Sequence, residues 1–177
     1  MQFTKVVIQA FSLLLSIPAS AGLCTTSELD YFSCTTGSAE IALCGSVDVG
    51  PNQGYIQFRL SPREGAKVFF PEARRPPAGL FVKDFQLWSK GGYESTLTFQ
   101  AGTLTYVLYA NWLVGSTEAM NEDKDGLYGY HSGLRVSRGD EEFQDLECVP
   151  PGEVWTDPRH LDRVLPAFLK PADAPNR

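Results

Sequence analysis

The chain has 177 residues, of which 43% are hydrophobic and 20% are charged, enough apolar material for one domain with a buried core. Its 15 Lys and Arg residues face 21 Asp and Glu residues, which gives a formal net charge of −6. This balance disfavours binding to nucleic acid or to anionic membrane surfaces, and it favours a basic partner.

Residues 1–21 have the layout of a secretory signal peptide. A short polar start with Lys5 precedes an apolar run over residues 6–17, and Ala-Ser-Ala at residues 19–21 forms an A-x-A cleavage site. The apolar run is shorter than the roughly 20 residues that a transmembrane helix requires. We therefore expect cleavage before Gly22 and a soluble product in the periplasm or outside the cell.

The exported part contains all four cysteines, Cys24, Cys34, Cys44 and Cys148. Because an exported chain meets an oxidising compartment, two disulfides are expected. Four cysteines allow three pairings, and the sequence alone does not choose among them. We favour Cys34 with Cys44 inside an N-terminal hairpin, and Cys24 with Cys148 tying together the ends of the β region. A lipid anchor on Cys24 is disfavoured, because Leu23 stands where a lipoprotein has a small residue.

Nine short runs rich in aromatic and β-branched residues, separated by clusters of Gly, Pro, Asn, Asp or Ser, predict an all-β fold. One of them alternates cleanly, with Ile56, Phe58 and Leu60 on one face of the strand. Tight turns are predicted at residues 35–38 and 100–102, so consecutive strands form an antiparallel meander. The nine runs are residues 29–35, 40–46, 55–60, 66–70, 80–88, 95–100, 103–113, 133–138 and 142–148.

The order of these runs favours a single all-β domain over residues 22–156. Residues 71–79 contain too many prolines for a strand and are expected to cross between two sheets. No repeat of fixed period marks the blades of a propeller. The sequence therefore leaves a sandwich and an irregular, propeller-like stack of small sheets as alternatives.

Residues 157–170 are predicted to form a C-terminal amphipathic helix that packs on its own domain. Asp157 is placed to cap this helix and Pro158 suits its first position, while Pro166 predicts a kink or an early end. Residues 171–177 are expected to be a disordered tail. The apolar stripe of the helix consists of Leu161, Val164, Leu165, Phe168 and Leu169.

The stretch 121–133 concentrates acids, aromatics and glycines. Asn121, Asp123 and Asp125, followed by Gly126, match the front half of an EF-hand calcium loop. An EF-hand also requires a bidentate glutamate at position twelve, where this chain has a serine, so an EF-hand is excluded. An irregular calcium loop and an ordinary solvated turn both stay open.

No catalytic set is assembled in the sequence. His131 and His160 are the only histidines, too far apart in a chain with oxidised cysteines to suggest zinc, and the G-x-S-x-G motif of serine hydrolases is absent. His131 and Ser132 are adjacent, and adjacent residues on a strand point to opposite faces. We expect no catalytic residue, no metal and no cofactor. A hydrolase that uses two of the 21 acids stays as an alternative.

The exported part contains five short elements in this order: Phe32 with Cys34, Leu43 with Cys44, residues 55–59, residues 105–109, and Cys148. In this order they resemble small exported all-β proteins of Gram-negative bacteria. The size, export and β content of this chain are similar to those of immunity proteins that protect bacteria from cell-wall amidases delivered by type VI secretion. That resemblance implies a protein that occupies the active-site cleft of the toxin, and it assigns no residue a role. Residues 88–91 also resemble the W-x-K-G element of periplasmic lysozyme inhibitors.

The sequence therefore predicts a periplasmic binding or inhibitor protein, most concretely an immunity protein, whose partner is a basic cell-wall hydrolase or a secreted effector. Loops on rigid β scaffolds are usual recognition sites, and acids in such a loop would meet a basic rim. One alternative is an ordinary acidic loop, and another is a carbohydrate-binding module that uses Trp88, Trp112 or Trp155. The predicted partner-binding residues are Ser116, Thr117, Glu118, Asn121, Glu122, Asp123, Asp125, Tyr128, Tyr130 and His131.

Overall fold

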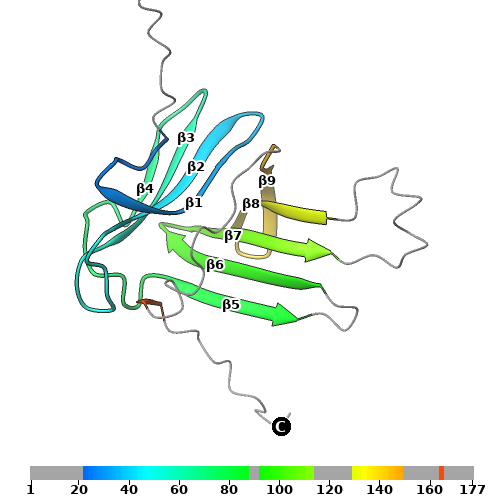
Figure 1. Cartoon of the computed structure of the whole chain (residues 1–177). Coiled ribbons are helices and arrows are strands. Elements are labelled where there is room, and N and C mark those ends of the chain that lie inside the picture. Colours follow the sequence, from blue (N-terminus) through cyan, green and yellow to red (C-terminus); the bar gives the residue numbers. More distant parts are fainter. Residues whose placement is uncertain (1–21, 88–91, 114–128, 150–163, 166–177) are drawn as a thin grey trace, which may run out of the picture.

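The computed structural model describes residues 22–87, 92–113, 129–149 and 164–165. These residues form nine strands in two antiparallel sheets, so the predicted all-β meander is confirmed (Figure 1). The strands are β1 (Glu28–Thr35), β2 (Ala39–Ser46), β3 (Ile56–Pro62), β4 (Val68–Phe70), β5 (Val82–Leu87), β6 (Tyr93–Ala101), β7 (Leu104–Leu113), β8 (Gly129–Arg138) and β9 (Glu141–Glu147).

Each sheet keeps the order of the chain. The first sheet has the order β1-β2-β3-β4 and the second has the order β5-β6-β7-β8-β9. The blue to cyan strands of the first sheet lie over the green to yellow strands of the second (Figure 1). Of the two predicted alternatives, the structure is therefore the sandwich.

The connections follow from local turn chemistry. In the β1–β2 turn, the hydroxyl of Thr36 accepts hydrogen bonds from the backbone amides of Ser38 and Ala39, at 3.2 and 2.9 Å. In the β6–β7 turn, Gly102 has φ +63°, a left-handed conformation that favours glycine. Both turns lie where the sequence predicts them.

The proline-rich segment joins the two sheets, as predicted. It leaves β4, the last strand of the first sheet, and enters β5, the first strand of the second. Pro77 of this segment is fully buried, and Phe70 and Phe81 at its two ends meet edge to face with ring centroids 5.6 Å apart. The crossing is thus fixed to the core at both ends.

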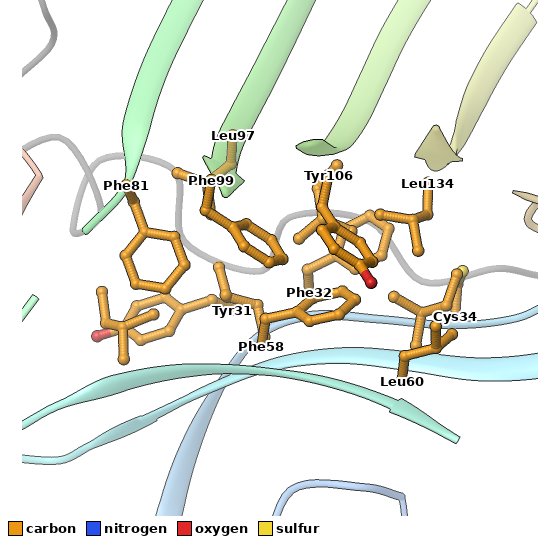
Figure 2. Packing of buried hydrophobic residues seen from close by; sticks show 14 of the residues in the cluster. Tyr31, Phe32, Cys34, Phe58, Leu60, Phe81, Leu97, Phe99, Tyr106 and Leu134 are labelled. Atoms are coloured by element: carbon orange, nitrogen blue, oxygen red, sulfur yellow. The ribbon is translucent and has the colours of Figure 1, made fainter. Parts of the chain in front are cut away.

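Aromatic rings from both sheets fill the space between them (Figure 2). Phe99 of β6 lies 4.8 Å from Phe58 of β3 and 5.1 Å from Tyr106 of β7, measured between ring centroids. Ile56 and Leu60 are also buried in this core, which confirms the predicted face of β3.

The disulfides pair differently from our prediction, which is wrong on this point. The bonds are Cys24–Cys44 and Cys34–Cys148, with Cα atoms 5.4 and 5.6 Å apart. Cys34 stands opposite Ile41 in the β1–β2 register. Cys44 lies three residues further along β2, about 10 Å away at the rise of a strand, which is too far for a disulfide.

The Cys34–Cys148 disulfide closes one side of the sandwich. Thr36 and Cys148 form an isolated antiparallel bridge, and the amide of Val149 donates to the carbonyl of Thr35 at 2.8 Å. The end of β9 therefore meets the end of β1, so the first and last described strands are joined. The chain has no free cysteine, which fits an oxidising, exported environment.

The predicted C-terminal helix falls mostly outside the described residues. Only Val164 and Leu165 of its apolar stripe are described, and both are buried in the core. The predicted signal peptide at residues 1–21 and the predicted tail at residues 171–177 also lie outside. Within the described part of the chain, no helix has the length and apolar character needed to cross a membrane.

Candidate functional site

The outer face of the second sheet gathers polar and charged side chains. Cross-strand register sets the two faces of this sheet apart: Leu97, Leu108, Leu134 and Leu146 form a row on the core face. Alternate residues point away from the core. We call the following residues the outer face: Asp84, Glu94, Thr96, Tyr109, Asn111, His131, Arg135, Asp145 and Glu147.

Tyr109 is the centre of the outer face. It pairs with Gly133 across the β7–β8 ladder, and its ring lies over the space that a side chain at Gly133 would fill. Its hydroxyl donates to Oδ1 of Asp145 at 3.1 Å, and the Arg135 guanidinium lies 4.4 Å from its ring centroid. The ring is therefore only 5% exposed although it lies on the outer face.

Tyr109 stays protonated at neutral pH. Burial raises the pKa of its phenol, and the charges of Asp145 and Glu147 raise this pKa further, against a smaller lowering by Arg135. The phenol therefore acts as a hydrogen-bond donor to Asp145 and not as a base. This hydrogen bond links β7 to β9 across the strand β8, which lies between them.

Replacement of Gly133 by alanine is expected to lower the free energy of unfolding by about 1 to 3 kcal/mol. The new Cβ would meet the carbonyl oxygen of Leu146 and lie 2.7 Å from the hydroxyl oxygen of Tyr109, so the tyrosine must leave its place. Gly37→Ala is the matched control, because nothing lies within 4 Å of a Cβ at that position. Urea unfolding of both variants measures the effect. Equal stabilities would show that Tyr109 is not held by this close contact.

An Arg–Glu ion pair and a His–Glu hydrogen bond flank Tyr109. Arg135 contacts Glu94 with an N–O distance of 2.9 Å, and Nδ1 of His131 lies 2.7 Å from Oε1 of Glu147. Both pairs are partly exposed and contribute little to stability. Their positions matter more than their energy, because they hold charged groups in place on a rigid sheet.

The outer face is acidic. It has four carboxylates, Asp84, Glu94, Asp145 and Glu147, against the single guanidinium of Arg135. The edge strand β9 adds the exposed acids Glu141 and Glu142. The charge of this face matches a basic surface.

Asn111 and Tyr130 each have a buried polar atom without a hydrogen-bond partner among the described residues, and both lie near the end of the β7–β8 pairing. These atoms are Oδ1 of Asn111 and the hydroxyl oxygen of Tyr130. A buried polar atom without a partner costs about 1 to 3 kcal/mol. Such a local loss of stability is common at functional sites, where the residues serve binding as well as folding.

The structure separates the two predicted site residues that it describes. Gly129 begins β8, so Tyr130 and His131 belong to a strand and not to a loop. His131 faces outward beside Glu147, whereas Tyr130 is half-buried and packs against the core, where burial raises its pKa. The other eight predicted residues, from Ser116 to Tyr128, lie outside the described part of the chain.

The base of the predicted binding loop is well defined. Pairing between β7 and β8 continues to Leu113 opposite Gly129, so residues 114–128 connect two adjacent paired strands. Asn111 pairs with His131 two positions below this end. The outer face therefore begins directly at the base of the connection.

The structure separates His131 from Ser132, as the alternation of a strand predicts. Ser132 is buried on the core face while His131 lies on the outer face, so these two residues form no catalytic pair. No group of three or more His, Cys, Asp or Glu among the described residues is placed to hold a metal. The calcium-loop residues 121–126, Trp88, Trp155 and the side chain of Trp112 lie outside the description.

Sequence reasoning missed most of the outer face. Tyr109, Arg135 and Asp145 lie in runs that we predicted as strands, without a functional role. Glu94 stands one residue before such a run, in a position that β6 includes in the structure. The alternation of polar and apolar residues along those runs points them away from the core. The alternation does not predict the register, which places these residues of four strands next to one another.

Comparison with known proteins finds no matching family model, no matching curated protein and no matching solved structure.

Proposed function

We propose that this protein is an exported inhibitor that binds a basic protein partner, most concretely a periplasmic immunity protein that blocks a peptidoglycan-degrading effector. The observation that carries the proposal is the acidic outer face of the second sheet, which reaches the base of the β7–β8 connection. The export expected from residues 1–21 and the two disulfides support a role outside the cytoplasm.

The outer face and the connection carry charge of the same sign. The connection contains Glu118, Glu122, Asp123 and Asp125, which have the same sign as the carboxylates of the outer face. Complementary charge speeds association with a basic partner and disfavours acidic competitors. A rigid sheet beneath a connecting segment is the usual arrangement of a recognition site.

An exported hydrolase is a second class of function that the described hollows do not favour. A hollow of about 530 Å³ lies where the β1–β2 turn, the β3–β4 turn and β9 meet. Its lining contains Glu64 as its one carboxylate, beside Arg63 and Gln144. Hydrolysis of a glycosidic bond usually requires two carboxylates across the cleft.

Replacement of residues 114–128 by a Gly/Ser linker is expected to abolish partner capture while the sandwich still folds. The replacement ends at Tyr128, because Gly129 begins β8 and pairs with Leu113. The measurement is pull-down from periplasmic extract, with captured proteins identified by mass spectrometry and then tested in a peptidoglycan-digestion assay. We expect stoichiometric capture and inhibition of a cell-wall hydrolase by the natural chain only.

Two controls make this experiment decisive. Replacement of the exposed residues 63–66 in the β3–β4 connection by Gly and Ser changes a comparable surface on the other sheet and should leave capture intact. The variant Asp84→Asn/Glu147→Gln should slow association several-fold at low salt, because it removes two of the four outer-face carboxylates. Capture that survives the 114–128 replacement would move the site elsewhere. Failure of the natural chain to capture or inhibit any cell-wall hydrolase would contradict the proposed function.

A further inference from the structure

The outer face of the first sheet carries a hollow of about 260 Å³ with a composition unlike the rest of this acidic protein. Arg59 of β3 and Phe69 stand opposite each other in the β3–β4 register, and both line the hollow. Lys67, Arg74, Leu23 and Gln57 also line it. Three cations thus surround one small cavity.

Four hydrogen bonds hold the Arg59 side chain in place and leave one of its N–H donors without a partner among the described residues. Its guanidinium has five N–H groups. Nε donates to Gln57 at 3.1 Å, Nη1 donates to the carbonyl of Leu23 and to Glu28, and Nη2 donates to Glu28. Four of the five donors are therefore engaged, and one N–H of Nη2 has no partner among the described residues. The Arg59 side chain lines the hollow and is only 7% exposed, so this remaining donor lies in a largely dry site.

Glu28 is the carboxylate of this cluster, and its acceptor sites are occupied. Oε2 accepts from the Thr25 amide at 2.7 Å and from Arg59 at 2.8 Å. Oε1 accepts from Arg59, from the Tyr55 hydroxyl and, at 3.3 Å, from Arg74. Glu28 thus supplies one negative charge against the three cations Arg59, Lys67 and Arg74, which leaves a net positive charge around the hollow.

Lys67 and Arg74 leave an excess of positive charge. Lys67 has no hydrogen-bond or ion-pair partner among the described residues. Arg74 is 55% exposed, makes only the long contact to Glu28, and stacks its guanidinium 4.7 Å from the ring centroid of Tyr55. The hollow is therefore rich in donors and poor in acceptors. Phe69 is 45% exposed and supplies an apolar wall beside them.

We infer that this hollow binds an oxyanion, carboxylate or phosphate, of a small molecule, held by Lys67, Arg74 and the remaining N–H of Arg59. A planar or tetrahedral oxyanion supplies the acceptors that the site lacks, and charge-assisted hydrogen bonds are the stronger kind. Phe69 would contact the apolar body of an organic acid. The site lies on the opposite sheet from the proposed partner surface and does not depend on it.

Titrations with inorganic phosphate and with propionate test the inference, and they show whether the hollow binds a phosphate or a carboxylate. We expect saturable chemical-shift changes at the amides of Lys67, Phe69 and Arg74 in ¹H–¹⁵N spectra, at constant ionic strength set with NaCl. Saturation by phosphate alone, or by propionate alone, would identify which oxyanion the site takes. Changes that grow linearly with either probe, or that fall elsewhere on the protein, would overturn the inference.

Lys67→Ala is the decisive variant, because Lys67 is exposed and has no partner among the described residues, so its loss should leave the fold intact. We expect it to weaken the apparent affinity by about fivefold or more, and Arg74→Ala to do the same. Arg138→Ala is the matched control, since Arg138 is an exposed cation at the end of β8 on the other sheet. Equal affinities for Lys67→Ala and Arg138→Ala would show that the probe responds to net charge and not to the hollow.

Discussion

Replacement of Cys34 and Cys148 by alanine is expected to lower the free energy of unfolding by about 4 to 5 kcal/mol. The bond closes a loop with a sequence separation of 114 residues, so it removes much of the conformational freedom of the unfolded chain. It also joins the two sheets at the β1–β9 side, where Thr36 bridges Cys148. Loss of the bond should therefore loosen the sandwich as a whole.

The Cys24–Cys44 bond is the internal comparison for this prediction. Its sequence separation is 20 residues, for which the same relation gives about 3 kcal/mol. Urea unfolding of the two double-alanine variants at pH 7 measures both losses. A larger loss for Cys24 and Cys44 would show that native contacts of the N-terminal segment, and not the size of the closed loop, decide the outcome.

The positions of the strands were predictable because they depend on local pattern. All nine predicted runs correspond to the nine strands, and the alternation of Ile56, Phe58 and Leu60 placed the core face of β3 correctly. The start of β8 was predicted at Gly133, whereas the strand begins at Gly129. The polar, glycine-containing sequence there has weak strand propensity, and its pairing with β7 decides its structure.

The disulfide pairing and the outer face were not predictable, because both depend on register and on contacts between distant segments. The β1–β2 register shifts between Asp30 and Phe32, which no local pattern reveals. Tyr109 and Asp145 meet only because three strands lie in one order and one register. Period-two alternation gives the face of a side chain, not its neighbours on that face.

The burial of Arg59 is another feature that alternation predicts wrongly. Gln57 and Arg59 alternate with the core residues of β3 and should face water, yet each is only 5% exposed. The chain before β1 covers them: Leu23 accepts a hydrogen bond from Arg59, and Cys24 is bonded to Cys44. The N-terminal segment thus covers part of the outer side of the first sheet, and that side contains a buried ion pair.

Replacement of Glu28 by glutamine is expected to lower the free energy of unfolding at pH 7 by about 3 kcal/mol. The Glu28 and Arg59 side chains are only 3% and 7% exposed, so the variant leaves a guanidinium without a counter-charge in a nearly dry site. Glu40→Gln is the matched control, because Glu40 is an exposed residue on β2 of the same sheet. Its effect should stay within about 0.5 kcal/mol.

The Glu28 carboxylate also makes the free energy of unfolding depend on pH. Burial alone would raise the pKa of Glu28, but hydrogen bonds from Arg59, Tyr55 and Thr25 outweigh burial and lower this pKa from 4.5 to about 2. Because the folded state holds the carboxylate ionised, its contribution is fully present above pH 4.5 and is lost as the pH falls toward 2. The shift corresponds to roughly 3 kcal/mol. Urea unfolding between pH 5 and pH 2 should show this loss in the natural chain and in Glu40→Gln, but not in Glu28→Gln.

Removal of both charges separates attraction within the pair from the cost of burying it. Glu28→Met/Arg59→Met has no buried charge at this place, so its stability at pH 7 should lie within about 1 to 2 kcal/mol of the natural chain and above that of Glu28→Gln. Its free energy of unfolding should also lack the decrease between pH 4.5 and 2 that Glu28 causes, because the variant has no carboxylate at this position. A double variant as unstable as Glu28→Gln would mean that the bonds from Arg59 to Leu23 and Gln57, and not the ion pair, hold the N-terminal segment on the sheet.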